Sequence, residues 1–293
     1  MDIKKLATEK RNSNSMNIDQ TSTIEMLTII NNEDKFVAKA VEKELGNIAR
    51  AVDLAAERFI GGGRLIYIGA GTSGRTGALD AIELTPTYSV LPDRAFGILA
   101  GGKDAMFFAV EGAEDSAQLA IADLEKVNLC EQDIVVALAA SGRTPYAIGA
   151  LQYANQIGAL TIAITCTEGN AMSEMAQVAI TPITGAEVIT GSTRMKAGTA
   201  QKMVSNMLST GIMIKSGKIY QNLMVNVQAT NEKLVNRSIN IISEALSLDK
   251  ETSKKIFEEA GAKVNVAIVM HNKGMDRLMA EKFLKENDDR INI

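Results

Sequence analysis

The sequence predicts an α/β protein built on a five-stranded parallel sheet with helices on both faces. Three observations predict this fold. Five short apolar runs rich in β-branched residues follow one another after residue 63. Helix-like stretches separate these runs, and such alternation of strand and helix is typical of parallel sheets. Each run is apolar on successive residues, so the strands should be covered on both faces.

Each element follows from the local pattern. Apolar residues at helical spacing predict two helices through about residue 59, which Gly61, Gly62 and Gly63 bring to an end. The strands are expected at residues 64–70, 95–101, 133–140, 160–166 and 178–184. The helices between them are expected at residues 73–83, 115–127, 144–156 and 169–176.

A polar loop and a long Met-rich helix follow the fifth strand. From about Lys218 the pattern is helical to the end, with interruptions near Leu248 and at residues 271–274. These boundaries predict a helical segment at 1–60, a central sheet domain at 61–217 and a small helical module at 218–293.

The composition narrows the classes of partner. The chain has 293 residues and a formal net charge of -4, so it has no long-range attraction for nucleic acid or acidic membranes. Its two cysteines, Cys130 and Cys166, lack metal-like spacing and suit a reducing compartment. The N-terminus lacks the apolar core of a signal peptide, and no apolar run approaches about 18 residues. We therefore expect a cytoplasmic protein with neither a nucleic-acid nor a membrane partner.

The tetrapeptide Ser-Gly-Arg-Thr occurs twice, at residues 73–76 and 141–144, each time directly after an expected strand. Ligands of open parallel sheets bind outside the carboxyl ends of the strands, where loops lead into helix N-termini. Helix N–H groups and Ser or Thr hydroxyls can hold a phosphate there without net positive charge. A third loop of similar chemistry spans residues 190–198. Together the loops predict a phosphate site, whereas simple helix capping is the alternative for any one of them.

A dinucleotide site is the main competing interpretation. Gly69, Gly71 and Gly74 satisfy the G-x-G-x-x-G pattern directly after a strand. A nicotinamide or flavin site would also place an acidic residue at the end of the second strand, but that strand runs into Gly101 and Gly102. This absence argues against a dinucleotide.

Longer segments carry a family resemblance. "IYIGAGTSGRTGALDAIELTPT", "VEGAEDSAQLAIADL", "ALAASGRTPY" and "EVITGSTRMKAGTAQK" together closely resemble the N-acetylmuramic acid 6-phosphate etherases, which belong to the sugar isomerase (SIS) domain superfamily. The resemblance covers nearly the whole chain. It implies an SIS-type sheet domain at 61–217 and an enzyme of the carbon–oxygen lyase type. The implied reaction converts N-acetylmuramic acid 6-phosphate to N-acetylglucosamine 6-phosphate and D-lactate, by elimination and then addition of water, without metal or organic cofactor.

The resemblance also implies two catalytic carboxylates. Glu83 aligns with the acid that protonates the departing lactate oxygen, and Glu114 aligns with the second catalytic carboxylate. The apolar neighbours of Glu83 and the nearby Pro86, which should end its helix, suggest partial burial of Glu83. For the nearby acidic residues we expect capping or surface roles: Asp80, Glu111 and Asp115.

Several residues match or neighbour the positions at which SIS domains hold a sugar phosphate. The matching hydroxyls are those of Ser73, Ser141 and Thr144, and further candidates are Thr72 and Ser192. The candidate charges are Arg75, Arg143, Arg194 and Lys196.

The spacing of Ser73 and Glu83 suggests an assembly. If residues 73–83 form one straight helix, Glu83 lies about 15 Å along its axis from Ser73, and a single sugar does not span that distance easily. We therefore expect a homodimer in which Glu83 serves the phosphate site of the other subunit, with a short or bent helix as the alternative. Two other activities stay open at this point, a non-catalytic sugar-phosphate sensor and a sugar-phosphate isomerase.

Overall fold

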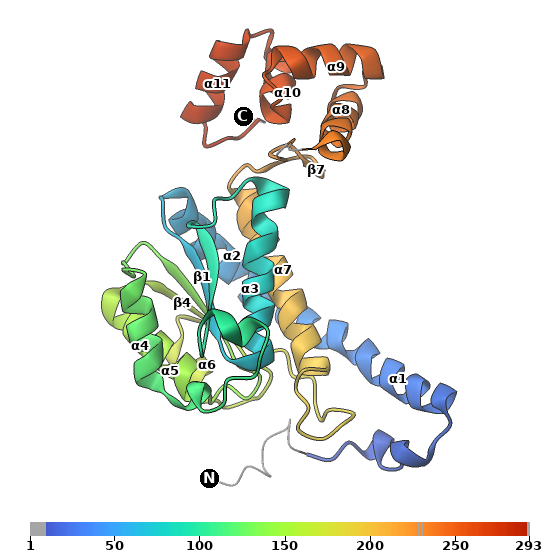
Figure 1. Cartoon of the computed structure of the whole chain (residues 1–293), viewed down its shortest axis with the longest axis vertical. Coiled ribbons are helices and arrows are strands. Elements are labelled where there is room, and N and C mark those ends of the chain that lie inside the picture. The colour runs from blue at the N-terminus through green and yellow to red at the C-terminus, as the bar shows by residue number, and fades with distance from the viewer. Residues whose placement is uncertain (1–9, 228, 230, 292–293) are drawn as a thin grey trace. The chain divides into compact units, whose positions relative to one another are not determined.

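The computed structural model describes residues 10–227, 229 and 231–291. The first nine residues lie outside this range, and the prediction that the N-terminus is not a signal peptide rests partly on them. The expected sheet is confirmed: five strands pair in parallel in the order β2-β1-β3-β4-β5 (Figure 1). The strands are β1 (Leu65–Gly69), β2 (Ala95–Leu99), β3 (Ile134–Leu138), β4 (Leu160–Ile164) and β5 (Val178–Ile180).

Helices alternate with these strands as expected. They are α1 (Thr23–Glu42), α2 (Leu45–Ile60), α3 (Gly71–Tyr88), α4 (Ala117–Lys126), α5 (Pro145–Ile157), α6 (Ala171–Met175) and α7 (Lys196–Lys215). Short 3-10 turns are η3 (Ser13–Ser15), η4 (Ile18–Gln20), η5 (Lys103–Met106) and η6 (Ala113–Asp115). The start of α1 is a capping box, in which the side chains of Ser22 and Glu25 each accept a backbone N–H of the other residue.

The expectation that Pro86 ends its helix is wrong, because α3 continues to Tyr88 with Pro86 inside it. A proline at this position lacks the N–H that would bond the carbonyl of Ile82. Ile82 is exposed, so we attribute the tolerance of Pro86 to hydration of that carbonyl.

Both faces of the sheet are covered. On one face, side chains of β1 and β3 pack with those of α4 and α5 in a buried cluster that includes Ile68, Val135, Leu124 and Leu151. On the other face, α3 lies so close that a Cβ at Gly77 would fall 2.7 Å from the Cβ of Tyr67. Figure 1 shows α4 and α5 together on one side of β1 and α3 on the other.

The chain forms two compact units, which we describe separately. One comprises residues up to Ala81 together with Ala95–Ser209, and the other comprises Ile82–Arg94 and the chain from Thr210 onward. Within the second unit lie α8 (Glu232–Leu246), α9 (Lys250–Glu259), α10 (Val264–Lys273) and α11 (Arg277–Glu286). These helices enclose their own apolar core. Helix ends near residues 248 and 274 confirm the expected interruptions.

The expectation of a helical pattern from Lys218, interrupted only near Leu248 and at residues 271–274, missed one feature. Strands β6 (Ile219–Tyr220) and β7 (Leu223–Met224) form a short antiparallel pair. Two-residue strands carry too few side chains to show a period of two, so the pattern could not reveal them. None of the described helices is both long enough and apolar enough to span a membrane.

The strand order determines where a ligand can bind. β2 and β3 lie on opposite sides of β1, so the connections that leave β1 and β3 diverge at their carboxyl ends. In open parallel sheets this topological switch point leaves a crevice that serves as the binding site. Both Ser-Gly-Arg-Thr segments follow these two strands.

Candidate active site

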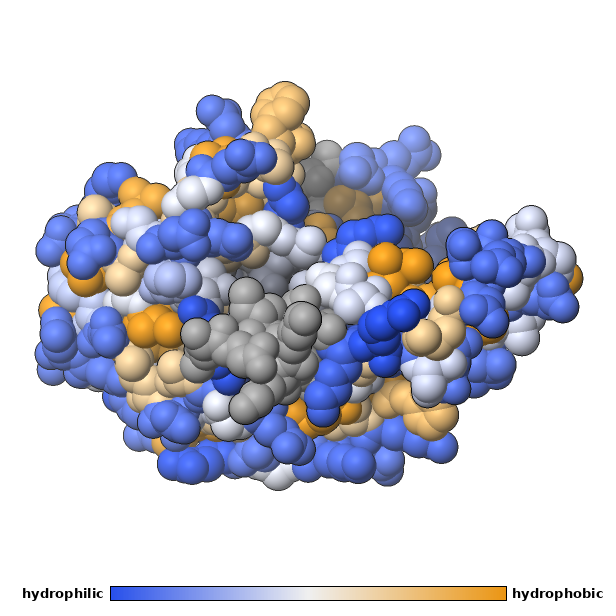
Figure 2. All heavy atoms as spheres, turned by 90° about the horizontal axis from the view of Figure 1, so that it is seen from below, coloured by the Kyte–Doolittle hydropathy of each residue, from blue (hydrophilic) through white to orange (hydrophobic). Residues whose placement is uncertain are grey.

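A cavity of about 370 Å³ lies at this switch point. Its volume is within the range of small-molecule sites. The lining residues come from the loops after β1 and β3, from η6 and from the loop before α7: Ala70, Gly71, Thr72, Ser73, Glu114, Asp115, Ala139, Ala140, Ser141, Arg143, Thr144, Pro145, Gly191 and Thr193. Half of them are glycine, serine or threonine. Figure 2 shows the molecule from below. Pale residues, which have an intermediate hydropathy like that of glycine, serine and threonine, occur near the middle of this face among hydrophilic residues.

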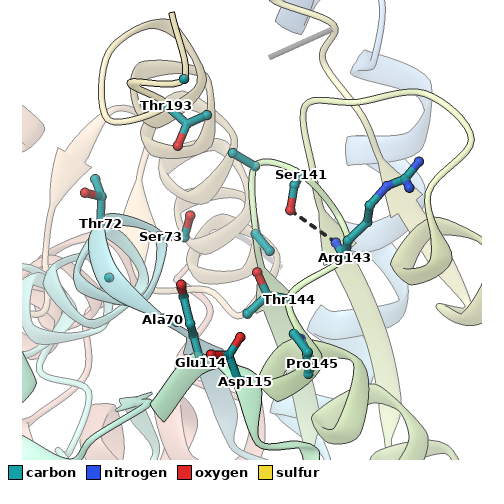
Figure 3. Close-up of a pocket in the computed structure, with 14 residues that line it drawn as sticks. Ala70, Thr72, Ser73, Glu114, Asp115, Ser141, Arg143, Thr144, Pro145 and Thr193 are labelled. Atoms are coloured by element: carbon teal, nitrogen blue, oxygen red, sulfur yellow. Dashed lines mark hydrogen bonds between the residues drawn. The ribbon is translucent and has the colours of Figure 1, made fainter. Parts of the chain in front are cut away.

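The structure brings most of the expected hydroxyl residues together. Thr72, Ser73, Ser141 and Thr144 all line the cavity. From the third loop Thr193 lines it, whereas Ser192 does not. In Figure 3, Thr193 lies at one end of the cavity and Glu114 at the other, with the hydroxyls of Ser141 and Thr144 between them. The cavity therefore has hydroxyl groups along its length and carboxylates at one end.

Two helix N-termini open on the cavity. The first residues of α3 line it, as do Thr144 and Pro145 at the start of α5. Thr144 is the N-cap residue of α5, but its side chain makes no capping hydrogen bond, so simple capping does not explain this hydroxyl. Neither helix has an acidic residue in its first turn. Their partial positive charge is therefore available to an anion.

The third helix N-terminus is already occupied. The buried carboxylate of Glu187 accepts the backbone N–H groups of Lys196 and Ala197, at 3.0 and 2.9 Å, and so caps α7 from within the protein. Burial raises the pKa of Glu187, against the opposing effect of these two N–H groups. The third loop thus contributes Gly191 and Thr193 to the cavity, but no open helix end.

Lys196 has a partner away from the cavity. Its ammonium lies 2.6 Å from the carboxylate of Glu33 on α1, and both side chains are more than nine-tenths buried. Glu33 also accepts a hydrogen bond from Asn14 Nδ2 at 2.8 Å. Burial alone would raise the pKa of Glu33, but the bonds from Asn14 and Lys196 outweigh it and the pKa is lowered. Lys196 and the exposed Arg194, two of the expected charges, do not line the cavity.

The two remaining arginines differ in placement. Arg75 Nε donates to the carbonyl oxygens of Ala105 and Met106, at 2.9 and 3.2 Å, and Nη2 donates to that of Phe108 at 3.0 Å. The backbone N–H of Arg143 donates to Ser141 Oγ at 3.3 Å, and its guanidinium extends away from the hydroxyls (Figure 3). Neither guanidinium is placed among the hydroxyls of the cavity.

Glycine allows the close approaches in both Ser-Gly-Arg-Thr segments. A Cβ at Gly74 would fall 2.5 Å from the carbonyl oxygen of Gly69, and a Cβ at Gly142 would fall 2.1 Å from Oδ1 of the buried Asn170. The two segments are nevertheless not equivalent, because Ser73 lies inside α3 whereas Ser141 lies in the loop before α5. The repeated tetrapeptide thus serves two different local structures at one site.

The acidic residues divide into three groups. Glu114 and Asp115 line the cavity from η6. We expected only a capping or surface role for Asp115, and this expectation missed that the residue lines the site. Asp80 is buried and accepts a hydrogen bond from Tyr67 OH at 2.8 Å, so its expected surface role is wrong. Glu83 does not line the cavity and is exposed in the single chain.

The expected partial burial of Glu83 is wrong for the single chain because its two apolar neighbours face different ways. Leu84 is 3% exposed, whereas Ile82 is 58% exposed. Since α3 is one helix from Gly71 to Tyr88, the alternative of a short helix is also wrong.

Three residues that support the site were not expected from the sequence. They are Glu187, Glu33 and Gln201, whose Oε1 accepts a hydrogen bond from Ser73 Oγ at 2.9 Å. Gln201 lies on α7, a helix that the sequence predicts. No local sequence motif, however, identifies this glutamine as a partner of Ser73. Among the described residues, no group of three or more His, Cys, Asp and Glu side chains could hold a metal ion.

Comparisons with known proteins identify relatives of this chain. Residues 47–155 match the glucokinase regulatory protein N-terminal SIS domain, and residues 109–211 match the SIS domain. The chain is 60% identical to N-acetylmuramic acid 6-phosphate etherase 1 of Enterococcus faecalis, over 99% of this chain and 97% of that relative. It is 56% identical to N-acetylmuramic acid 6-phosphate etherase of Clostridium botulinum strain Okra, over 99% and 96%.

A solved structure shares the fold. A Bacteroides fragilis protein assigned as a phosphosugar isomerase involved in capsule formation aligns with a TM-score of 0.51 at 20% identity, over 67% of this chain and 92% of that chain. At this identity the likeness concerns the fold alone.

Proposed function

The chain belongs to the N-acetylmuramic acid 6-phosphate etherase family, and from this premise we propose how its cavity performs the reaction. The enzyme cleaves the D-lactyl ether of N-acetylmuramic acid 6-phosphate to give N-acetylglucosamine 6-phosphate and D-lactate. The observation that carries the proposal is the cavity itself, which joins two open helix N-termini and five hydroxyl residues to the carboxylate of Glu114.

The phosphate is assigned to the hydroxyl-rich part of the cavity. Ser73, Ser141 and Thr144 supply hydroxyl donors, and the first turns of α3 and α5 supply backbone N–H groups. Such donors hold a phosphate dianion without a basic surface, which suits a chain of net charge -4. Thr72 and Thr193 are further ligands. Because all these residues fall within 61–217, the sugar-phosphate site is assigned to the sheet domain.

Glu114 is assigned the proton transfer at C2. In the open-chain sugar the aldehyde makes the C2 proton acidic, so a carboxylate at the cavity wall can remove it. A C2–C3 double bond forms, the C3–O bond breaks, and its electron pair leaves with the lactate oxygen, which takes a proton from an acid. Water then adds to C3 and a proton returns to C2.

Glu83 is assigned as the acid, acting from a second copy of the chain. On α3 it lies ten residues beyond Ser73, about 15 Å along a straight helix axis, and it does not line the cavity. Leu79 and Ile82 are 43% and 58% exposed, and Leu79 lies about one helical turn before both Ile82 and Glu83, at spacings of three and four residues. An exposed apolar strip beside a carboxylate supports a homodimer in which this part of α3 is covered.

Mixing two inactive variants tests the shared site. Subunits carrying Glu83→Gln and subunits carrying Ser141→Ala should each be poorly active, and a mixture that exchanges subunits should regain activity, because each hybrid dimer holds one intact site. Hybrid dimers that form without regaining activity contradict the assignment.

We also assign the protein to the cytoplasm, which the two free thiols of Cys130 and Cys166 support.

Lactate release tests the function. The purified protein is incubated with N-acetylmuramic acid 6-phosphate and D-lactate is measured, with Glu83→Gln and Glu114→Gln alongside. The wild type should release lactate, and each variant should be slower by roughly 10²- to 10⁴-fold. A folded wild type that binds the sugar phosphate and releases no lactate would instead support a sensor.

A further inference from the structure

A second cavity adjoins the first. It has a volume of about 220 Å³ and shares Ala70, Gly71 and Glu114 with the first cavity. The rest of its lining is Arg75, Ala100, Ala105, Ala109, Val110, Glu111 and Gly112. The carboxylate assigned to proton transfer thus belongs to the wall between two cavities, and only the first of them has the hydroxyls that suit a phosphate.

The guanidinium of Arg75 is the cation of this second cavity. Three backbone carbonyls orient it through Nε and Nη2, while Nη1 donates to no described residue. None of the ion pairs found in the described part of the chain includes Arg75, although its side chain is half-buried. A guanidinium has five N–H donors in a planar fork that matches a carboxylate. Arg75 therefore has a fixed orientation, unused donors and an uncompensated charge.

The remaining wall is small and mostly apolar. Ala100, Ala105, Ala109 and Val110 present methyl groups, which suit a compact apolar substituent beside the anion. Glu111 and Glu114 are the opposing charges of this cavity, but both are exposed, so solvent and salt weaken their repulsion of a bound carboxylate. The cavity thus fits a short carboxylate that carries a methyl group better than a neutral amide, which would leave the guanidinium without a counter-charge.

We propose that the second cavity binds the lactyl group of the substrate, with the carboxylate on Arg75 and the methyl group against the alanines. The proposal rests on the proposed function. With the sugar phosphate in the first cavity and the lactyl group in the second, the scissile C3–O bond lies at their shared wall, beside Glu114. Arg75 is then a specificity-determining residue for the leaving group rather than a phosphate ligand.

Two ligands that differ only in the lactyl group test the proposal. We would measure kcat/KM for N-acetylmuramic acid 6-phosphate and the inhibition constant of N-acetylglucosamine 6-phosphate, which lacks the lactyl group. Arg75→Gln should lower kcat/KM by about ten- to a hundredfold, the effect of losing a charge-assisted hydrogen bond, and should change the inhibition constant less than about twofold.

A second variant avoids disturbing the carbonyls that Arg75 holds. Ala109→Leu fills part of the cavity without removing a hydrogen bond and should give the same selective loss. Ser141→Ala is the matched control, because loss of a phosphate ligand should weaken both ligands alike. Melting temperatures verify that each variant is folded.

The outcomes separate this proposal from the proposed function. Equal weakening of both ligands by Ala109→Leu overturns it, because the acetamido group and the sugar are common to both. No loss of kcat/KM in either variant also overturns it. A wild type that releases no lactate at all contradicts the proposed function instead, whatever Arg75 does.

Discussion

Ser73 Oγ donates a hydrogen bond to Gln201 Oε1 at 2.9 Å. Gln201 is 1% exposed, and its Nε2 has no partner among the described residues. This arrangement directs the hydroxyl hydrogen of Ser73 away from the cavity and leaves a buried N–H₂ group unsatisfied, which is costly. Turning the amide by 180° lets Nε2 donate to Ser73 Oγ. The hydroxyl hydrogen is then available to a phosphate oxygen, so Gln201 positions the ligand.

Replacing Gln201 should therefore affect substrate binding through Ser73. Gln201→Glu provides only acceptors and keeps the Ser73 hydrogen away from the phosphate, so KM should rise about tenfold, the value of one hydrogen bond to a charged group. Steady-state kinetics provide the measurement. In a Ser73→Ala background the same change should have little further effect on KM. Independent, additive effects of the two substitutions would contradict positioning through Ser73.

The ion pair of Lys196 and Glu33 should contribute stability rather than binding. Lys196→Met leaves a buried carboxylate without its cation, so the free energy of unfolding should fall by about 3–5 kcal/mol. Urea denaturation measures this change. The double variant Glu33→Met with Lys196→Met removes both charges and should recover much of the loss. A phosphate ligand would behave otherwise: Lys196→Met would raise KM and leave the midpoint of denaturation unchanged.

The sheet and its helices were predictable because they depend on local pattern. All five strands lie within the expected ranges, since continuous apolar runs bounded by polar turns are visible without tertiary information. The continuation of α3 past Pro86 was not predictable in this way, because tolerance of an internal proline depends on which side of the helix meets solvent.

The site was predictable only in part. Ser73, Ser141 and Thr144 could be placed together because parallel strands present their carboxyl ends on one edge. Which helix N-terminus stays open depends on long-range partners: Glu187 closes that of α7, and Lys196 pairs with a residue 163 positions away in the sequence. A single sequence holds no signal for such pairs.

Asp133 should make stability depend on pH in the acid range. Arg64 donates to it through Nε at 3.0 Å and the N–H of Cys130 donates at 3.0 Å. Burial alone would raise the pKa of Asp133, but these bonds outweigh it, so the pKa lies below its ordinary value of 3.8. A lowered pKa gives stability that is present above about 3.8 and is lost as the pH falls through the folded-state value.

Asp133→Asn measures this contribution. At pH 7 the variant should be less stable than the wild type by roughly 1.5–3 kcal/mol, the value of hydrogen bonds to a charged group. The difference should hold down to about pH 5 and shrink as the pH falls below 3.8. Urea denaturation at several pH values gives both quantities, and a difference that grows toward pH 3 would show that the sign is wrong.

Replacing Gly142 by alanine should cost more stability than replacing Gly169, although both glycines have a left-handed backbone. Gly142 and Gly169 have φ of +65° and +57°, but an added Cβ meets the buried Asn170 side chain 2.1 Å away at Gly142 and open space at Gly169. Gly169→Ala should therefore cost only the backbone strain, about 1–2 kcal/mol. Gly142→Ala should cost more and also raise KM, because the displaced loop carries Ser141 and Thr144. Denaturation and kinetics on both variants separate strain from displacement. Equal losses of stability with unchanged KM would mean that the contact of Gly142 with Asn170 does not position the phosphate loop.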